Sequence, residues 1–343
     1  MSLKVNLLAA GAVLAIAIVS DGASARENLR IVGSNTISSY AEVVAEVMVE
    51  QSFAKPEISP ASTGPGIKHF CRGVGDLYPD IAMAGRPMKD EEMADCTANA
   101  VSEVTEIKIG YDAILLSYRN DSERFSSISL TGRQIWLAMA KSVPVNGVMA
   151  ANPYKSWSEI DPSLPAMPIL LYMPDRDSAM REVIGKLVLE PVCADEPAIA
   201  ALPEDAREDA CLTVREDSNI VEFSDSRDEL TAMAEATEQP LALTNMQLMT
   251  TTPEAKSFKA VKLGGVEPTF ATIASGEYKV TRTHFLYVKN SQIGKVPGVA
   301  EFVTNFLSDD AQGPEGYLTK MGLIPLKDDE RKEMLARISS LSN

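Results

Sequence analysis

Apolar and polar positions alternate along the chain in a way that predicts strands followed by helices. An apolar run at residues 29–34 has the length of a buried strand, and from residue 38 the apolar positions recur at helical spacing. A polar turn at residues 33–36 joins the two. Ser39 and Glu42 also fit a capping box, so the first residue of this helix is predicted only to within a few positions.

The same unit recurs further along the chain. Strands are predicted near residues 57–59, 79–88, 107–118, 167–173, 241–246 and 284–288, and helices near 67–74, 130–140, 179–189 and 298–307. Strands that alternate with helices favour an α/β fold. Residues 143–155 are predicted to form a loop, and residues 193–211 a surface excursion.

The N-terminus has the three-part pattern of a secretory signal peptide. Lys4 precedes an uncharged apolar run at residues 7–19, and small residues follow up to Ala25. The run is shorter than the roughly 20 residues that a membrane-spanning helix needs. We therefore expect a signal peptide at residues 1–25, cleavage after Ala25, and export to the periplasm.

Charge and length limit the classes of partner. The full chain carries a formal net charge of -16, and losing Lys4 and Asp21 with the signal peptide leaves that value unchanged. Nucleic acid and anionic membranes are poor partners for such a chain. Residues 26–343 are long enough for two lobes, and we expect a monomer without a cofactor.

Four cysteines, Cys71, Cys96, Cys193 and Cys211, follow the predicted signal peptide. An even number in an exported chain favours disulfides. The arrangement suggests two local pairs, Cys71 with Cys96 and Cys193 with Cys211, although four cysteines allow three connectivities and the spacing does not choose among them. No C-x-x-C spacing occurs, and His69 and His284 are the only histidines, so no metal site is expected.

Three loops that lead from a strand into a helix carry the candidate chemistry. They lie at residues 34–36, 62–66 and 175–178, and each contains serine or threonine. The start of a helix offers unpaired backbone N–H groups and a partial positive charge, which suit an oxyanion. Gly64 and Gly66 would let the backbone approach a ligand closely. Such loops also cap helices without binding anything, so each one alone is weak evidence.

No catalytic pattern accompanies these loops. The chain has no G-x-S-x-G, H-E-x-x-H or GxxxxGK[ST] motif, and neither histidine has an evident carboxylate partner in the sequence. We therefore expect a binding protein rather than an enzyme.

Several segments, in order, resemble the phosphate-binding proteins that feed the bacterial phosphate ABC importer, within the two-lobed periplasmic binding proteins. They are IVGSNT at 31–36, STGPGIK at 62–68, PDIAMAGRPM at 79–88, LTGRQIW at 130–136, WSEIDPSLP at 157–165, PDRDSAMRE at 174–182, GVEPTFATIASGEYKVTR at 265–282 and GLIPL at 322–326. The resemblance covers nearly the whole chain after the signal peptide. It implies an anion-binding cleft between two lobes and a membrane permease as partner.

The resemblance also implies particular ligand contacts. Ser34, Asn35 and Thr36 would line the first wall, Ser62 and Thr63 the second, and Asp80 would face the ligand. A carboxylate beside an anion is costly unless the anion carries a proton to donate, as hydrogen phosphate does and sulfate does not. Asp80 would then favour phosphate over sulfate. Without the resemblance, the sequence favours a structural role in which Asp80 caps or ends its strand.

A fourth element departs from the family, where an arginine precedes a Ser-Gly-Thr triplet. Only Ser178 of the triplet remains here, Met180 replaces the threonine, and Pro174 stands where the arginine is expected. The positive charge must come from Arg176, from Arg181 or from elsewhere. Arginine can pair with an oxyanion through two hydrogen bonds, so we expect one of these two to bind.

These expectations combine into one architecture. Residues 26–108 and 282–343 form lobe 1, residues 109–281 form lobe 2, and two hinge crossovers lie near Gly110 and Lys279. Inorganic phosphate would be captured between the lobes for delivery to the permease. The alternatives are a two-lobed sensor or assembly subunit that has lost tight phosphate binding, and a secreted enzyme with a phosphate pocket.

Overall fold

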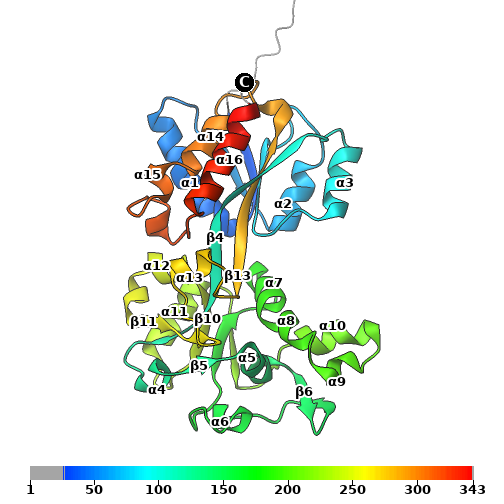
Figure 1. Ribbon diagram of the computed structural model, residues 1–343, viewed down its shortest axis with the longest axis vertical. Helices are drawn as coiled ribbons and strands as arrows, with labels where there is room; N and C mark the ends of the chain where they lie inside the picture. The colour runs from blue at the N-terminus through cyan, green and yellow to red at the C-terminus, as the bar shows by residue number, and fades with distance from the viewer. Residues whose placement is uncertain (1–25, 27, 342–343) are drawn as a thin grey trace, which may run out of the picture.

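The computed structural model describes residues 26 and 28–341, which form two α/β lobes joined by long strands (Figure 1). Lobe 1 is the upper lobe in Figure 1 and contains both ends of the described chain, whereas lobe 2 is built from its middle. The predicted two-lobed α/β fold is confirmed. The predicted signal peptide lies outside the described residues.

Lobe 1 is a five-stranded sheet with helices on both faces, in the strand order β2-β1-β3-β13-β4. Its elements are β1 (Arg30–Gly33), α1 (Asn35–Glu50), β2 (Glu57–Pro60), α2 (Thr63–Phe70), β3 (Ile81–Ala84), α3 (Asp90–Ala98), β4 (Val104–Arg119), β13 (Thr281–Lys289), η3 (Asn290–Gln292), α14 (Val299–Phe306), α15 (Asp309–Gln312), η4 (Thr319–Met321) and α16 (Asp328–Leu341).

Lobe 2 continues the strand path as β4-β10-β8-β9, with β11 also paired to β4. Its elements are α4 (Glu123–Ser126), β5 (Ser129–Leu130), α5 (Gly132–Met139), β6 (Ser142–Val145), β7 (Val148–Ala151), α6 (Trp157–Ile160), β8 (Leu171–Pro174), α7 (Ala179–Ile184), η1 (Gly185–Leu189), α8 (Glu190–Cys193), α9 (Pro197–Ala200), α10 (Glu204–Leu212), β9 (Ile220–Phe223), α11 (Ser226–Glu235), β10 (Leu241–Asn245), α12 (Leu248–Thr251), η2 (Pro253–Ser257), β11 (Phe258–Ala260), β12 (Lys262–Leu263) and α13 (Phe270–Ala274).

Strands β4 and β13 connect the lobes as an antiparallel pair (Figure 1). Gly110 lies in β4 at this crossing, with φ of 141°. A Cβ atom there would lie 2.8 Å from the carbonyl oxygen of Ile324, so only glycine fits without a shift. The boundaries that the sequence suggests, at 108/109 and 281/282, fall inside β4 and at the start of β13.

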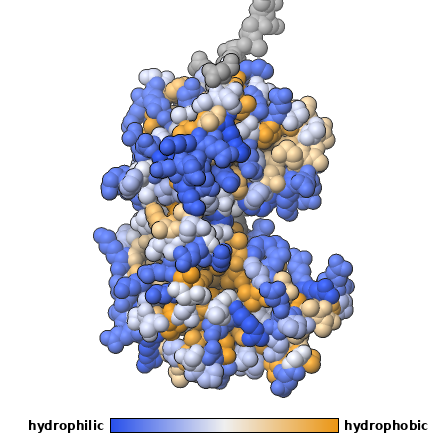
Figure 2. All heavy atoms as spheres, viewed as in Figure 1, coloured by the Kyte–Doolittle hydropathy of each residue, from blue (hydrophilic) through white to orange (hydrophobic). Residues whose placement is uncertain are grey.

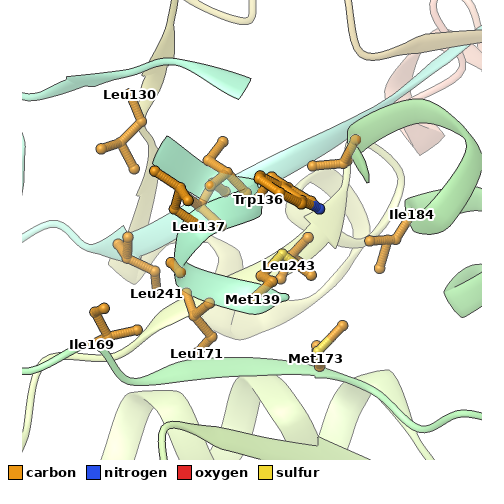
Figure 3. Packing of buried hydrophobic residues seen from close by; sticks show 14 of the residues in the cluster. Leu130, Trp136, Leu137, Met139, Ile169, Leu171, Met173, Ile184, Leu241 and Leu243 are labelled. Carbon is orange, nitrogen blue, oxygen red and sulfur yellow. The ribbon is translucent and has the colours of Figure 1, made fainter. Parts of the chain in front are cut away.

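Each lobe has its own hydrophobic core. Lobe 2 packs α5 and α7 against β8 and β10, and Figure 3 shows Trp136, Leu171, Ile184 and Leu243 in this cluster. Lobe 1 has one cluster on each face of its sheet. A smaller cluster beside the β4–β13 connection packs Ile324 of lobe 1 against Ile273 and Tyr278 of lobe 2.

Several local expectations need correction. Helix α1 begins at Asn35 and α2 at Thr63, so both start directly in the polar loops and the capping box at Ser39 is not used. Residues 142–151 form a β-hairpin instead of a loop, because Asn146 and Gly147 adopt the positive φ angles of a tight turn. Residues 193–211 are largely helical.

Both predicted disulfides are confirmed, Cys71–Cys96 between α2 and α3 and Cys193–Cys211 between α8 and α10. Across residues 26 and 28–341, no helix is both long and apolar enough to cross a membrane.

Candidate functional site

Three strand ends of lobe 1 meet at the edge of the sheet that faces lobe 2. Strand β1 is parallel to β2 and to β3, so the residues after Gly33, Pro60 and Ala84 emerge at the same edge. Helices α1 and α2 start at this edge. Ligands commonly bind outside the carboxyl ends of strands in open α/β sheets.

Two glycines allow the helix starts to approach each other closely. Gly33 has φ of 130°, and a Cβ atom there would lie 2.2 Å from the carbonyl oxygen of Met83. A Cβ atom on Gly66 would lie 2.5 Å from the Cα atom of Gly33. Gly66 therefore allows α2 to pack closely against β1. The sequence instead predicted that it would let the backbone approach a ligand.

The predicted hydroxyl groups lie at this junction. Ser34 and Ser62 are the N-cap residues of α1 and α2, yet within the described chain neither side chain caps its own helix. The Thr63 hydroxyl accepts a hydrogen bond from the Gly85 backbone N–H at 3.1 Å. Thr36 lies in the first turn of α1 and accepts a hydrogen bond from Arg282 at 3.2 Å. These hydroxyls converge where helix starts leave backbone N–H groups unpaired.

The two remaining lobe 1 residues of the prediction lie in the same helix starts. Asn35 is the first residue of α1 and is exposed. Gly64 is the second residue of α2, and a Cβ atom there would lie 3.8 Å from a guanidinium nitrogen of Arg86. Their backbone N–H groups belong to the first helical turn, where α-helices have no internal partner.

Arg282 is the residue that the sequence reasoning missed. It lies in β13 directly opposite Asp112 of β4, and its Nη2 atom is 2.7 Å from the Asp112 carboxylate. A Cβ atom on Gly85 would lie 3.5 Å from Nη1 of Arg282 and 3.7 Å from the Thr63 hydroxyl. The guanidinium group therefore contacts the start of α1 and lies beside Gly85, which is hydrogen-bonded to the start of α2. Its one sequence signal is its place at the end of the 265–282 segment.

A second arginine borders the same edge. Arg86 follows β3 and forms two hydrogen bonds of 2.7 Å to the carboxylate of Glu92. The hydrogen bond with Glu92 is the main cause that raises the pKa of Arg86, and the negative charge of Glu182 in lobe 2 adds to it. Arg86 thus lies within electrostatic reach of the opposite lobe.

Lobe 2 contributes the loop between β8 and α7. Ser178 caps α7, accepting a hydrogen bond from the Met180 backbone N–H at 3.1 Å. A cavity of about 490 Å³ brings Ser62 of lobe 1 together with Arg176, Ser178 and Arg181 of lobe 2. In Figure 2 the surface is indented between the two lobes. The structure therefore joins predicted residues from both lobes at one cleft.

The two candidate arginines of lobe 2 differ in their surroundings. Arg181 donates to the carbonyl oxygen of Pro174 at 2.9 Å and pairs with Glu222 at 3.1 Å, with its side chain 15% exposed. Burial lowers the pKa of Arg181, and Glu222 opposes that shift. Arg176 pairs with Glu216 and Glu222 and is 62% exposed. Arg181 is the better-positioned of the two.

Asp80 does not lie at the cleft, and this expectation is corrected. It precedes β3 and so lies at the opposite end of the sheet from Gly85. Its carboxylate accepts hydrogen bonds from Arg26 and from the backbone N–H of Arg30. Burial is the main cause that raises the pKa of Asp80, and these partners oppose it. Asp80 stabilises lobe 1 instead of facing a ligand.

Each arginine at the cleft is already paired with a carboxylate. The pairs are Arg282 with Asp112, Arg86 with Glu92, Arg181 with Glu222 and Arg176 with Glu216. The cleft therefore offers directed donors with little net positive charge. A site of this kind recognises an anion through local dipoles and hydrogen bonds.

The described residues hold no group of three or more histidine, cysteine, aspartate or glutamate side chains placed to bind a metal ion. His284 is fully buried in β13, and burial lowers its pKa to about 3. It is therefore a neutral core residue at physiological pH.

The fold and the cleft define a two-lobed solute-binding protein, and comparisons with known proteins agree. The family model described as a PBP superfamily domain matches residues 19–310. The chain therefore belongs to the PBP superfamily.

Individual relatives are distant but match over most of their length. Protein SphX of Synechocystis is 24% identical over 88% of this chain and 80% of its own. A possible phosphate binding protein from Planctomyces limnophilus has a TM-score of 0.63 at 21% identity, covering 92% of this chain and 99% of that one. An ABC-type phosphate transport receptor from Vibrio cholerae has a TM-score of 0.55 at 16% identity, covering 83% and 95%.

Proposed function

We propose that this protein is an exported binding protein that captures inorganic phosphate between its lobes and delivers it to a membrane ABC permease. The observation that carries the proposal is the convergence of the α1 and α2 starts with Arg282 at the edge facing lobe 2. The Ser34 and Ser62 hydroxyls, which do not cap their helices in the described chain, add donors there.

Binding would favour a closed form of the protein. A tetrahedral oxyanion has many acceptor lone pairs, and donors from one lobe satisfy only some of them. Ser62 and Arg181 already line one cavity from opposite lobes. A ligand that contacts both lobes interacts more favourably with the closed arrangement and shifts the equilibrium toward it.

Geometry and family support different parts of the ligand assignment. Asp80 lies away from the cleft, so its argument for phosphate over sulfate no longer applies. The cleft supports a tetrahedral oxyanion, and the phosphate binding described for relatives favours phosphate. The resemblance to transport receptors supports the permease as partner, and the predicted signal peptide supports the periplasmic location.

A sensor or assembly subunit with weak phosphate binding is the second candidate. Met180 supplies no hydroxyl where the related loop has one, and its side chain packs against the lobe 2 core. The loss of this donor favours weaker phosphate binding, whereas the donors that remain at the lobe 1 edge favour retention of phosphate binding.

Calorimetry with inorganic phosphate tests the proposal. Thr36→Val removes a hydroxyl at the cleft, and Thr304→Val removes an exposed helical hydroxyl in lobe 1 as a matched control. We expect Thr36→Val to weaken binding about tenfold and Thr304→Val to leave it unchanged. If the unaltered protein gave no heat of binding and no thermal shift at millimolar phosphate, that result would contradict the transport function and favour the second candidate.

A further inference from the structure

The cavity beside Ser62 is larger than a phosphate ion requires. Its volume is about 490 Å³, whereas a five-atom oxyanion fills at most roughly 150 Å³ if each atom takes no more than the about 30 Å³ of a water molecule. Apart from Ser62, the residues that line it all belong to lobe 2. The cavity therefore extends away from the lobe 1 edge, along the helical segment that starts at α7 and toward α10.

A glycine and a π-helix shape one wall of this cavity. Gly185 begins the π-helical segment η1, and a Cβ atom there would meet only the Leu212 side chain, at 3.9 Å. Leu189 and Leu212 supply apolar surface beside it. π-Helical turns are rare and often occur at functional sites. The wall at Gly185 is recessed, which leaves room for a substituent.

The far end of the cavity carries both hydrogen-bond donors and acceptors. Lys186 pairs with Glu190 at 3.0 Å and lies 3.9 Å from Glu208 of α10. Lys186 and Glu208 both line the cavity. An ammonium group beside a carboxylate suits a neutral group that can donate and accept, such as a hydroxyl.

The outer wall is held in place by the fold. The Cys193–Cys211 disulfide ties α10 to α8, and the Trp136 indole donates to the carbonyl oxygen of Cys211 at 3.1 Å. Figure 3 shows Trp136 and Ile184, the residue before Gly185, within the lobe 2 core. The segment expected to be a surface excursion thus forms one side of a rigid cavity.

We propose that the site also accepts phosphate monoesters with a small hydroxylated substituent. The phosphoryl group would bind at the mouth, where Ser62 meets Ser178 and Arg181. The carbon chain would lie between Gly185 and Leu212, and its hydroxyls would reach Lys186 and Glu208. This inference rests on the proposed function, since it uses the same anion site.

Calorimetric titrations with sn-glycerol 3-phosphate and with inorganic phosphate test the inference. The unaltered protein is expected to bind the two within about tenfold of each other. Gly185 has right-handed helical φ and ψ angles, so Gly185→Leu keeps the helix and fills the recess. It is expected to weaken the ester by about tenfold or more and inorganic phosphate by less than about twofold.

Two further variants complete the test. Ala336→Leu places the same side chain on the exposed face of α16 in lobe 1 and is expected to change neither affinity. Lys186→Ala removes a half-exposed side chain and is expected to weaken binding of the ester but not of inorganic phosphate. It replaces Gly185→Leu in the test if that variant does not fold.

The outcomes separate the two proposals. Phosphate binding without ester binding would overturn the inference alone, as would equal losses for both ligands in Gly185→Leu. Absence of binding for both ligands would overturn the proposed function and the inference with it.

Discussion

Arg282 and Asp112 face each other across the antiparallel strands that connect the lobes, and their side chains form an ion pair. The pair is almost fully buried, with the two side chains 9% and 1% exposed. Asp112 also accepts a hydrogen bond from the Ala113 backbone N–H at 2.9 Å. The carboxylate therefore holds the guanidinium group in place beside Thr36.

Loss of the Arg282 charge is expected to weaken phosphate binding. Arg282→Gln removes charge-assisted hydrogen bonds, each of which contributes about 1.5–3 kcal/mol, so the affinity should fall roughly 10- to 100-fold. It also leaves Asp112 buried without its partner, which lowers stability. Arg282→Gln combined with Asp112→Asn should recover thermal stability without recovering affinity. Recovery of affinity in the double variant would contradict ligand contact by Arg282.

Asp80→Asn is expected to affect stability and not ligand choice. The substitution leaves the buried guanidinium of Arg26 without its carboxylate partner, which lowers the free energy of unfolding, and removal of the disfavoured Asp80 charge offsets part of that loss. Asp76→Asn, an exposed change in the adjacent loop, provides the control. Denaturant unfolding measures the loss, and competition calorimetry measures the ratio of phosphate to sulfate affinity. A changed ratio with unchanged stability would return Asp80 to the binding site.

Arg181 and Arg176 should differ as contributors to binding. Arg181 is mostly buried and fixed by Pro174 and Glu222, so little entropy is lost when it binds an anion. Arg176 is largely exposed and screened by solvent. Arg181→Ala is expected to lower phosphate affinity about tenfold, and Arg176→Ala less than about threefold. Calorimetry on the two variants would disprove this assignment if the larger loss came from Arg176.

Glu229 predicts a pH dependence of stability. It is fully buried in α11, neither carboxylate oxygen has a hydrogen-bond partner among residues 26 and 28–341, and burial raises its pKa to about 8. Between pH 4.5 and 8 the unfolded chain loses this proton while the folded chain retains it, so stability falls as pH rises through that range.

The matched variant is Glu229→Gln, which resembles the protonated acid. At pH 8 it should be more stable than the unaltered protein, by roughly 3–5 kcal/mol for a shift of this size. Near pH 4 the two should be equal. Urea unfolding at both pH values provides the measurement, and a constant difference across the range would exclude the titration of Glu229 as the cause.

The fold and the lobe 1 hydroxyls could be predicted from sequence because their signals are local. Ser34 and Ser62 each lie between a predicted strand and a predicted helix, and parallel strands bring such loops to one edge. The same rule explains the error at Asp80. Asp80 comes before β3, so it lies one strand length from the cleft, about 13 Å for four residues.

Arg282 could not be assigned in the same way. Its role depends on the register that places it opposite Asp112, and these residues are far apart in the sequence. The cavity beside Gly185 depends likewise on how α10 packs against η1, because its Lys186–Glu208 and disulfide contacts join separate helices. Neither relationship leaves a periodic signal in the chain.

A crystal structure of the protein grown with inorganic phosphate tests the central claim most directly. The claim is that donors from both lobes hold one oxyanion at the cleft. We expect phosphate within hydrogen-bond distance of Thr36, Ser62 and Arg282 in lobe 1 and of Arg181 in lobe 2, with the lobes closer together than here. Phosphate bound outside the cleft, or to one lobe alone with no change in the arrangement of the lobes, would contradict the account.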